Sequence, residues 1–297
     1  KSKKSLLCSG SLERLIPFQN NDLPGIMLSG SIRSYLNRWG INSFGKVVLF
    51  TNNDDTYFTA SDLISNGINV IGVVDTRDNP KFYDPKIKVF KSSQVVNAKG
   101  KLCLKGVDVV NKEGELIHLK CDYLGVSGGW NPNIHLSCHT GVRPEWNENI
   151  YAFVAGKKNI STHLKTVGSA NGKFTFNECI IDAEKQVLDI LSDLKVKAKK
   201  YNLPKVKDQL FEIDPFWFVQ FGSQRKWVDL QNDVTVKDIE MAYAENFRSV
   251  EHLKRYTTLG MGTDQGKTSN VTGLAILASL SNKSIPDVGT TVFRPPY

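Results

Sequence analysis

Hydrophobic and polar positions along the chain fall into runs that predict an α/β fold, and the clearest set lies early in the chain. A continuous apolar run over 46–50 is typical of a buried parallel strand. Helical spacing over 57–66 then predicts a helix that ends at Gly67. A second apolar run over 70–74 predicts a strand that ends at Asp75. This strand–helix–strand unit is half of a dinucleotide-binding fold. The predicted fold class is therefore Rossmann-like α/β.

The turn inside this unit, Thr51–Asp55, is polar and contains no glycine. A dinucleotide fingerprint needs glycines there, because they let the backbone approach a pyrophosphate. Asp75 nevertheless stands where an acidic partner of a ribose hydroxyl would be expected. We therefore interpret the unit as a retained scaffold, with direct phosphate binding as the alternative.

Other segments can be assigned around this unit. Helical spacing predicts helices over 29–39 and 174–192, and apolar runs predict strands over 88–90, 107–110, 116–120 and 121–127. We expect residues 1–45 and 118–192 to form part of a first FAD- or NAD-binding domain, and residues 46–117 to form a second dinucleotide-type domain nested within it. A linker over 193–221 is expected to lead to a small helical domain, 222–282, with helices over 236–245, 250–256 and 271–281.

Two glycines, Gly128 and Gly129, follow the last predicted strand of the α/β part. Glycines at the carboxyl end of a buried strand allow a ligand to approach the backbone, and open α/β sheets bind ligands at that edge. The segment from there to Cys138 is therefore a candidate NAD site, with Asn131, Leu136 and Cys138 as contact residues. A tight turn without a ligand is the alternative.

Two further glycine-rich passages precede predicted helices. The passage around Ser169 runs into the helix over 174–192, whose first-turn amides could face an anionic or polar cofactor group. The second passage, 257–269, offers amides, hydroxyls and a cation to a phosphate. Its candidate ligands are Thr257, Thr258, Lys267 and Thr268. It is not a P-loop, because Met261 replaces the first glycine, and a simple helix-entry loop is the alternative.

Composition and charge exclude several classes of function. Of the 297 residues, 40% are apolar and 23% are charged, which is enough to bury a core, and no run of about 18 apolar residues predicts a membrane span. The net charge is +8, but the densest basic run, 195–200, ends a predicted helix and contains no aromatic residue. We therefore expect a cytoplasmic protein with neither a membrane nor a nucleic acid as partner.

The cysteines and histidines indicate no metal site. The five cysteines are widely separated and form no CxxC pair, which excludes a dithiol reductase of the disulfide-reductase type. Only His135 and His139 share helical spacing, and no HExxH motif accompanies them. No nucleophile–base or paired-acid constellation is recognisable, so no catalytic residue is assigned.

Several passages together resemble the α (large) subunit of heterotetrameric sarcosine oxidase. The most specific are the last ones in the chain, and the first three also resemble subunits of amine and opine dehydrogenases. The passages are Pro17–Leu28 with Tyr35–Arg38, Val48–Asp54, Ser127–Leu136, Phe247–Thr258 with Thr263–Asn270, and Phe293–Tyr297. The resemblance covers nearly the whole chain.

The resemblance implies a multisubunit flavoenzyme that oxidatively demethylates sarcosine to glycine, with tetrahydrofolate as one-carbon acceptor and oxygen as electron acceptor. It implies that this subunit binds NAD, that FMN lies at the interface with a β subunit, and that the β subunit carries FAD and the amine-oxidising site, with smaller subunits completing the complex. The chain would be a fragment: a first GxGxxG turn would precede Lys1, and residues 283–297 would begin a linker to a folate-binding, aminomethyltransferase-like domain.

The small helical domain is also similar to the [2Fe–2S] module of bacterioferritin-associated ferredoxins. The four ligand positions fall on Asp229, Gln231, Asp264 and Lys267, none of which is a thiolate, so cluster binding is excluded. The resemblance instead implies that this domain lies near the interfacial FMN. Two alternatives stay open: an α subunit of an opine, proline or other amine dehydrogenase, and a non-catalytic scaffold subunit.

Overall fold

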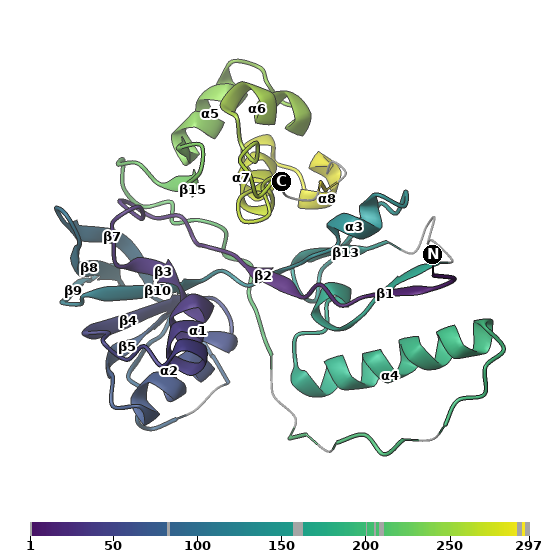
Figure 1. The fold of residues 1–297 in the computed structure, drawn as a ribbon. Helices are drawn as coiled ribbons and strands as arrows, with labels where there is room; N and C mark the ends of the chain where they lie inside the picture. Colours follow the sequence, from purple (N-terminus) through teal and green to yellow (C-terminus); the bar gives the residue numbers. More distant parts are fainter. Residues whose placement is uncertain are drawn as a thin grey trace.

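The computed structural model describes residues 2–81, 84–156, 163–199, 201–204, 206–207, 211–289 and 293–294, and Figure 1 shows their arrangement. A sheet covered by two helices lies at the left of the view, and a helical part lies at the top. A long helix, α4 (Phe176–Asp193), lies at the lower right beside short strands. Among these described residues, no helix is long and apolar enough to span a membrane.

A five-stranded parallel sheet organises the first part and confirms the Rossmann-like prediction. Its order is β3 (Ile26–Leu28), β10 (Tyr123–Ser127), β4 (Lys46–Thr51), β5 (Asn69–Asp75) and β6 (Val89–Phe90). Strand β4 is central and buried on both faces, which explains its uninterrupted apolar run. Helix α2 (Asp55–Ser65) joins β4 to β5 and begins two residues before the predicted start.

Both faces of this sheet are covered. Helix α1 (Ser29–Trp39) and helix α2 pack on one face around Leu49 and Tyr57. An antiparallel meander, β7 (Gln94–Gly100), β8 (Leu104–Val110) and β9 (Leu116–Leu119), covers the other face around Phe50 and Val107. The two apolar layers fix the sheet between them.

The sheet extends beyond the range expected for the nested domain. The pattern placed that domain at 46–117, but β3, α1 and β10 lie outside this range and belong to the same layered unit. Strand β10 inserts between β3 and β4, so the unit extends from residue 26 to residue 127. Pairing between strands distant in sequence is not encoded in local hydrophobic periodicity, which is why the sequence pattern drew the boundary too narrowly.

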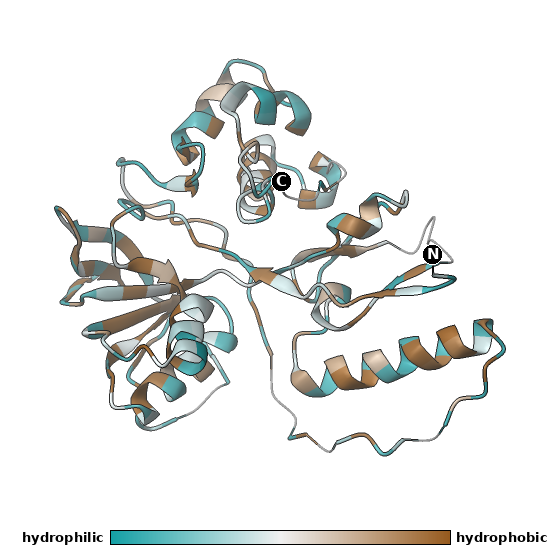
Figure 2. Cartoon of the chain, viewed as in Figure 1, coloured by the Kyte–Doolittle hydropathy of each residue, from teal (hydrophilic) through white to brown (hydrophobic). Residues whose placement is uncertain are grey.

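Short paired strands form the second part. Strand β1 (Ser5–Leu7) pairs with β14 (Leu164–Thr166), β2 (Ser11–Glu13) with β11 (Trp130–Pro132), and β12 (Pro144–Asn147) with β13 (Ala152–Ala155). Helix α3 (His135–Cys138) lies between β11 and β12 in sequence, and a 3₁₀ turn, η1 (Gly168–Asn171), follows β14. Figure 2 shows that α4 carries many apolar side chains, and Phe176, Ile181 and Leu188 on it are exposed.

The helical part contains β15 (Trp227–Asp229), β16 (Val234–Thr235), α5 (Val236–Ala244), α6 (Val250–Thr257), α7 (Asn270–Ser281) and α8 (Ile285–Val288). Thr235 caps α5 in a capping box with Asp238, and Ser249 caps α6, so both helices begin where the helical spacing predicted, at residues 236 and 250. Helix α7 is buried nearly all round, because it is the centre on which the other helices pack.

The predicted linker is attached to the sheet at its C-terminal end. We call residues 211–214 the strap. The backbone of Asp54 pairs with Glu212, that of Asn52 pairs with Asp214, and Val219 donates to the carbonyl of Pro17. These bonds fix the route of the chain between the α/β parts and the helical part.

Candidate functional site

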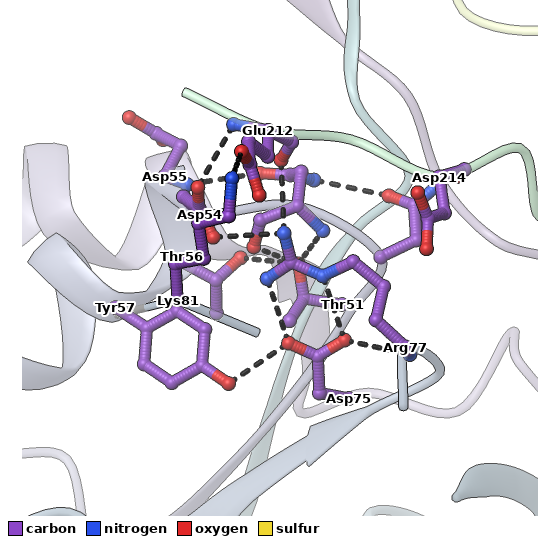
Figure 3. Close-up of polar contacts among 12 residues, drawn as sticks. Thr51, Asp54, Asp55, Thr56, Tyr57, Asp75, Arg77, Lys81, Glu212 and Asp214 are labelled. Carbon is purple, nitrogen blue, oxygen red and sulfur yellow. Dashed lines mark hydrogen bonds and ion pairs between the residues drawn. The ribbon is translucent and has the colours of Figure 1, made fainter. Parts of the chain in front are cut away.

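A buried ionic cluster fills the carboxyl edge of β4 and β5, and Figure 3 shows its side chains. The Arg77 guanidinium lies 2.8 Å from Asp54 Oδ1 and 2.8 Å from Asp75 Oδ2, and its Nε donates to Asp75 Oδ1. Arg77 also donates to the Glu212 carbonyl on the strap, at 3.0 Å, and the Tyr57 hydroxyl donates to Asp75. This edge of a Rossmann-type sheet is where a dinucleotide would normally bind.

The cluster is held together by charge in a region closed to water. The side chains of Arg77, Asp54 and Asp75 are 4%, 1% and 0% exposed. Burial opposes the charged form of Arg77, but hydrogen bonds and charges from Asp75 and Asp54 outweigh it and raise the Arg77 pKa. Burial raises the pKa of Asp54, and burial together with Asp75 raises that of Tyr57.

The strap lies over the glycine-free turn. Asp54 Oδ2 accepts the backbone N–H of Glu212 at 2.8 Å, and Asn52 Nδ2 donates to the Asp214 carbonyl at 2.7 Å. Asp54, Asp75 and the strap thus occupy the place of a pyrophosphate with two carboxylates and a peptide. Two buried carboxylates at this edge disfavour an anion, which agrees with the retained-scaffold interpretation.

The glycine pair at the end of β10 approaches another part of the chain. A Cβ on Gly128 would lie 2.9 Å from the carbonyl of Leu15. A Cβ on Gly129, where φ is +96°, would lie 2.3 Å from Ile213 Cδ1 on the strap and 2.5 Å from Arg14 Nη2. Packing within the protein therefore requires both glycines, whether or not a ligand is present.

Arg14 connects this glycine pair to the predicted contact residue Asn131. Arg14 is 1% exposed, and it donates from Nε to the Gly128 carbonyl and from Nη1 to Asn131 Oδ1, each at 3.0 Å. Burial lowers the Arg14 pKa to about 9. Asn131 Nδ2 in turn donates to the Lys267 carbonyl at 3.4 Å, so the structure brings the predicted NAD segment and the predicted FMN loop together.

The other predicted contact residues lie apart from one another. Leu136 is 53% exposed, whereas Cys138 is buried in a core with Phe153 and Phe293. Ser169 is half-buried in η1, near Gly10. At the start of α4, a capping box made by Thr175 and Glu178 gives the amides of these two residues partners within the protein.

The loop over 257–269 satisfies most of its own donors. The hydroxyls of Thr257 and Thr258 donate to the carbonyls of Leu253 and Thr257. The Thr268 hydroxyl and the amides of Gly266 and Thr268 donate to the Asp264 carboxylate. The Asp264 carboxylate thus accepts the amides that we considered as phosphate ligands. The hydroxyls of Thr257, Thr258 and Thr268 also have partners within the protein.

Lys267 keeps the character expected of an anion ligand. Its side chain is half-buried, and no carboxylate in the described part of the chain lies within ion-pair distance of it. Burial lowers its pKa, with Asp264 acting in the opposite direction. Lys267, Asn131 and His135 line a small cleft of about 10 Å³, which is room for a single water molecule.

The positions at which the resemblance placed cluster ligands make hydrogen bonds within the protein. Asp229 is buried, and its carboxylate accepts from the Gly260 amide at 2.8 Å and from the Ser269 hydroxyl at 3.2 Å. Gln231 accepts from Thr263. Hydrogen bonds from these side chains thus hold the loop over 257–269. No group of three potential metal ligands occurs within the described ranges.

Sequence reasoning missed Arg14, its neighbour Glu13, and Arg77, and it named Asp264 only as a former cluster-ligand position. Each is a single charged residue in a short loop or at a strand end, which local periodicity treats as solvated surface. Only burial distinguishes them, since Arg14, Glu13 and Arg77 are all no more than 5% exposed. A charged residue next to a predicted strand end was the available signal.

Among known protein families, one matches the helical part of the chain. Residues 223–297 match the family described as the sarcosine oxidase A3 domain. The α subunit of sarcosine oxidase from Rhizobium meliloti is 34% identical over 99% of this chain, and that from Corynebacterium sp. strain U-96 is 33% identical over all of it. Over nearly its whole length the chain is therefore similar to sarcosine oxidase α subunits. It spans about a third of the length of these relatives, 30% and 32% respectively.

More distant comparisons extend the fold assignment. L-proline dehydrogenase from P. horikoshii superposes with a TM-score of 0.73 at 17% identity, over 99% of this chain and 57% of that one. Thioredoxin reductase from T. acidophilum superposes with a TM-score of 0.51 at 16% identity, over 65% of this chain and 66% of that one. These two likenesses show that the chain has a Rossmann-type fold.

Proposed function

We propose that this chain is part of the NAD-binding α subunit of a multisubunit flavoenzyme that oxidatively demethylates sarcosine to glycine. In that enzyme a β subunit carries FAD and oxidises the amine, FMN lies at the interface, tetrahydrofolate accepts the one-carbon unit, and oxygen accepts the electrons. The observation that carries the proposal is the 34% identity, over 99% of this chain, to the α subunit of a sarcosine oxidase.

Turnover by the purified complex tests the activity. Co-expression of the whole α subunit with its partner subunits should give sarcosine-dependent oxygen consumption and glycine formation. Formation of a one-carbon adduct of tetrahydrofolate tests the acceptor. Absence of sarcosine turnover in a complex that contains both flavins would contradict the proposal.

A second candidate function is the oxidation of opines by a complex in which this chain has the same place. One of the subunits of opine oxidase from Rhizobium meliloti is 21% identical over all of this chain, which covers 74% of its length. Parallel assays with sarcosine, proline and an opine separate the candidates by kcat/KM. Turnover of none of them by a fully flavinated complex would favour a scaffold role.

We assign NAD to the Gly128–Cys138 segment, with Asn131 as the polar contact and Leu136 and Cys138 beside it. The backbone there follows the carboxyl end of β10, where sheets of this type bind nucleotides. Substitution of Gly129 is a poor test, because any side chain would collide with Ile213. Asn131→Ala is expected to lower the NAD content of the complex, and Asn149→Ala, an exposed asparagine, is the control.

We assign the FMN phosphate to Lys267, which lies on the loop that the A3 match covers. A lost charge-assisted contact costs about 1.5 to 3 kcal/mol, so Lys267→Gln should weaken FMN retention at least about tenfold. Lys283→Gln makes the same change at an exposed lysine and should leave retention unchanged. Because a covalent flavin link could mask the loss, FMN incorporation is followed during assembly.

The position of Asp264 sharpens this test. Its carboxylate now accepts the amides that a phosphate would need, so a bound phosphate must displace it or lie beside it. Asp264→Asn removes the negative charge and should retain FMN as well as the wild type or better. Normal incorporation by Lys267→Gln would place the phosphate elsewhere.

A further inference from the structure

A cavity of about 270 Å³ lies outside the carboxyl ends of β3 and β10, between strand β2 and the helical part. Its lining is mainly apolar and includes Phe18, Met27 and Val126, while Gln231 and Thr268 contribute from the helical part. The cavity is distinct from the ionic cluster on β4 and β5. Its size is close to the lower end of small-molecule sites in proteins.

The charged residue that lines this cavity, Glu13, is itself buried. Glu13 lies at the end of β2 and is 5% exposed. Its Oε2 accepts the backbone N–H of Gly30, near the start of α1, at 2.8 Å. Its Oε1 is buried and makes no hydrogen bond of regular geometry among the described residues, although the Ser127 hydroxyl lies close enough to the carboxyl to act on its pKa. A buried polar atom without a partner is rare in folded proteins and destabilises the folded state, so this atom needs an explanation.

The surroundings favour the neutral form of the Glu13 carboxyl. Burial raises its pKa to about 8, and the charge of Asp55 on α2 acts in the same direction, while the Ser127 hydroxyl and the Gly30 amide act against it. On its own strand the neighbouring charge is Arg14, whose side chain is committed to Gly128, Asn131 and Tyr151. Because Oε2 accepts an N–H, the proton of the neutral acid belongs on Oε1.

A protonated Oε1 is a hydrogen-bond donor on a residue that lines an apolar cavity. A partner for it must present an acceptor oxygen or ring nitrogen, and must be neutral, since the lining offers no counter-charge for an ion. Phe18 and Met27 provide an aromatic face and a polarisable sulfur, which both favour contact with an aromatic ring. A protonated carboxyl that recognises a ligand oxygen in an apolar site is known protein chemistry.

We propose that this cavity binds a neutral aromatic or heteroaromatic molecule that carries a carbonyl or carboxamide oxygen, and that Glu13 donates a hydrogen bond to that oxygen. The nicotinamide ring of NAD and the pyrimidine edge of a flavin both have this chemistry. The inference does not depend on which amine the complex oxidises.

Benzamide is the probe, and toluene, which lacks the acceptor, is its matched control. Binding to the purified complex is measured by saturation-transfer NMR, up to about 10 mM, the weak end expected for so few atoms. Benzamide should bind saturably and at least about tenfold more tightly than toluene. Its affinity should fall between pH 7 and pH 9, because ionisation removes the donor.

Variants at Glu13 separate recognition from folding. Glu13→Leu, which removes the donor, should lose at least about tenfold in benzamide affinity and little in toluene affinity. Glu13→Gln, which resembles the protonated acid, should bind benzamide but lose the pH dependence. Glu148→Gln makes the same change on the surface and should do nothing. Benzamide binding by Glu13→Leu equal to the wild type would overturn the proposal.

A ligand retained from the cell could block the probe. Small molecules released by denaturing the wild-type complex are therefore identified by mass spectrometry and compared with those released from Glu13→Leu. If NAD or FMN displaces benzamide, the cavity binds the ring of that cofactor. If neither displaces it, the cavity binds a separate small molecule. Absence of both benzamide binding and a retained ring compound would refute the proposal.

Discussion

Replacing Arg77 with methionine tests whether the ionic cluster stabilises the Rossmann-type unit. The change leaves Asp54 and Asp75 buried without their cation, at 1% and 0% exposure, and removes the bond to the strap at Glu212. Removing one partner of a buried ion pair typically costs about 3 to 5 kcal/mol. With a urea dependence of about 2 kcal/mol per molar, the unfolding midpoint of this unit should fall by about 1.5 to 2.5 M.

The local unfolding midpoint is measured by hydrogen exchange over a urea series, with peptides from β4 and β5 analysed by mass spectrometry. Arg33→Met is the control, because Arg33 pairs with Asp62 at 2.7 Å but its side chain is 35% exposed, and an exposed pair contributes about 1 kcal/mol or less. Adding Asp54→Asn and Asp75→Asn to Arg77→Met removes the orphaned charges. Relative to Arg77→Met alone, that triple variant should recover at least about 1 kcal/mol of the free energy of unfolding.

The pH dependence of the Arg77→Met variant has a definite sign. Burial already raises the pKa of Asp54 and Arg77 lowers it, so loss of Arg77 raises it further. A carboxyl whose folded pKa exceeds its unfolded pKa loses stability as pH rises through that interval. The deficit of the variant should therefore be larger at pH 8 than at pH 5. An equal cost for Arg77→Met and Arg33→Met, at both pH values, would refute the role assigned to the cluster.

Three further predictions concern other parts of the molecule. Gly129→Ala should destabilise the junction of β10 with the strap by about 1 to 3 kcal/mol, seen as faster exchange around Ile213, because the new Cβ would lie 2.3 Å from that side chain. Thr175→Ala should cost about 1 kcal/mol of α4 stability by removing its capping box, with helix fraying measured by proteolysis at its start. Burial and Lys267 lower the pKa of His135 to about 4, so acidification from about pH 6.5 to 4 should destabilise the wild type more than His135→Asn. Lys267→Gln should raise the His135 pKa, as measured by NMR titration, and an unchanged value would contradict the contact between them.

The sequence by itself determined the elements and the family. The apolar runs at 46–50 and 70–74 became β4 and β5, since strands buried on both faces need continuous hydrophobic residues. Thr235 and Ser249 marked helix starts, because capping depends on residues only three positions apart. The predicted resemblance to the sarcosine oxidase α subunit was confirmed by relatives that match 99% of the chain or more.

The tertiary structure decided which strands pair and where charges are buried. Strand β10 inserts between β3 and β4, so the unit is larger than the 46–117 range indicated by the pattern. Gly129 faces Ile213, and Asp264 accepts hydrogen bonds from the amides that were expected to hold a phosphate. Arg77 meets Glu212 across 135 residues of sequence. Hydrophobic periodicity describes one element at a time, whereas these contacts join distant segments, and burial turns ordinary surface residue types such as Glu13 and Arg77 into the groups on which the candidate sites depend.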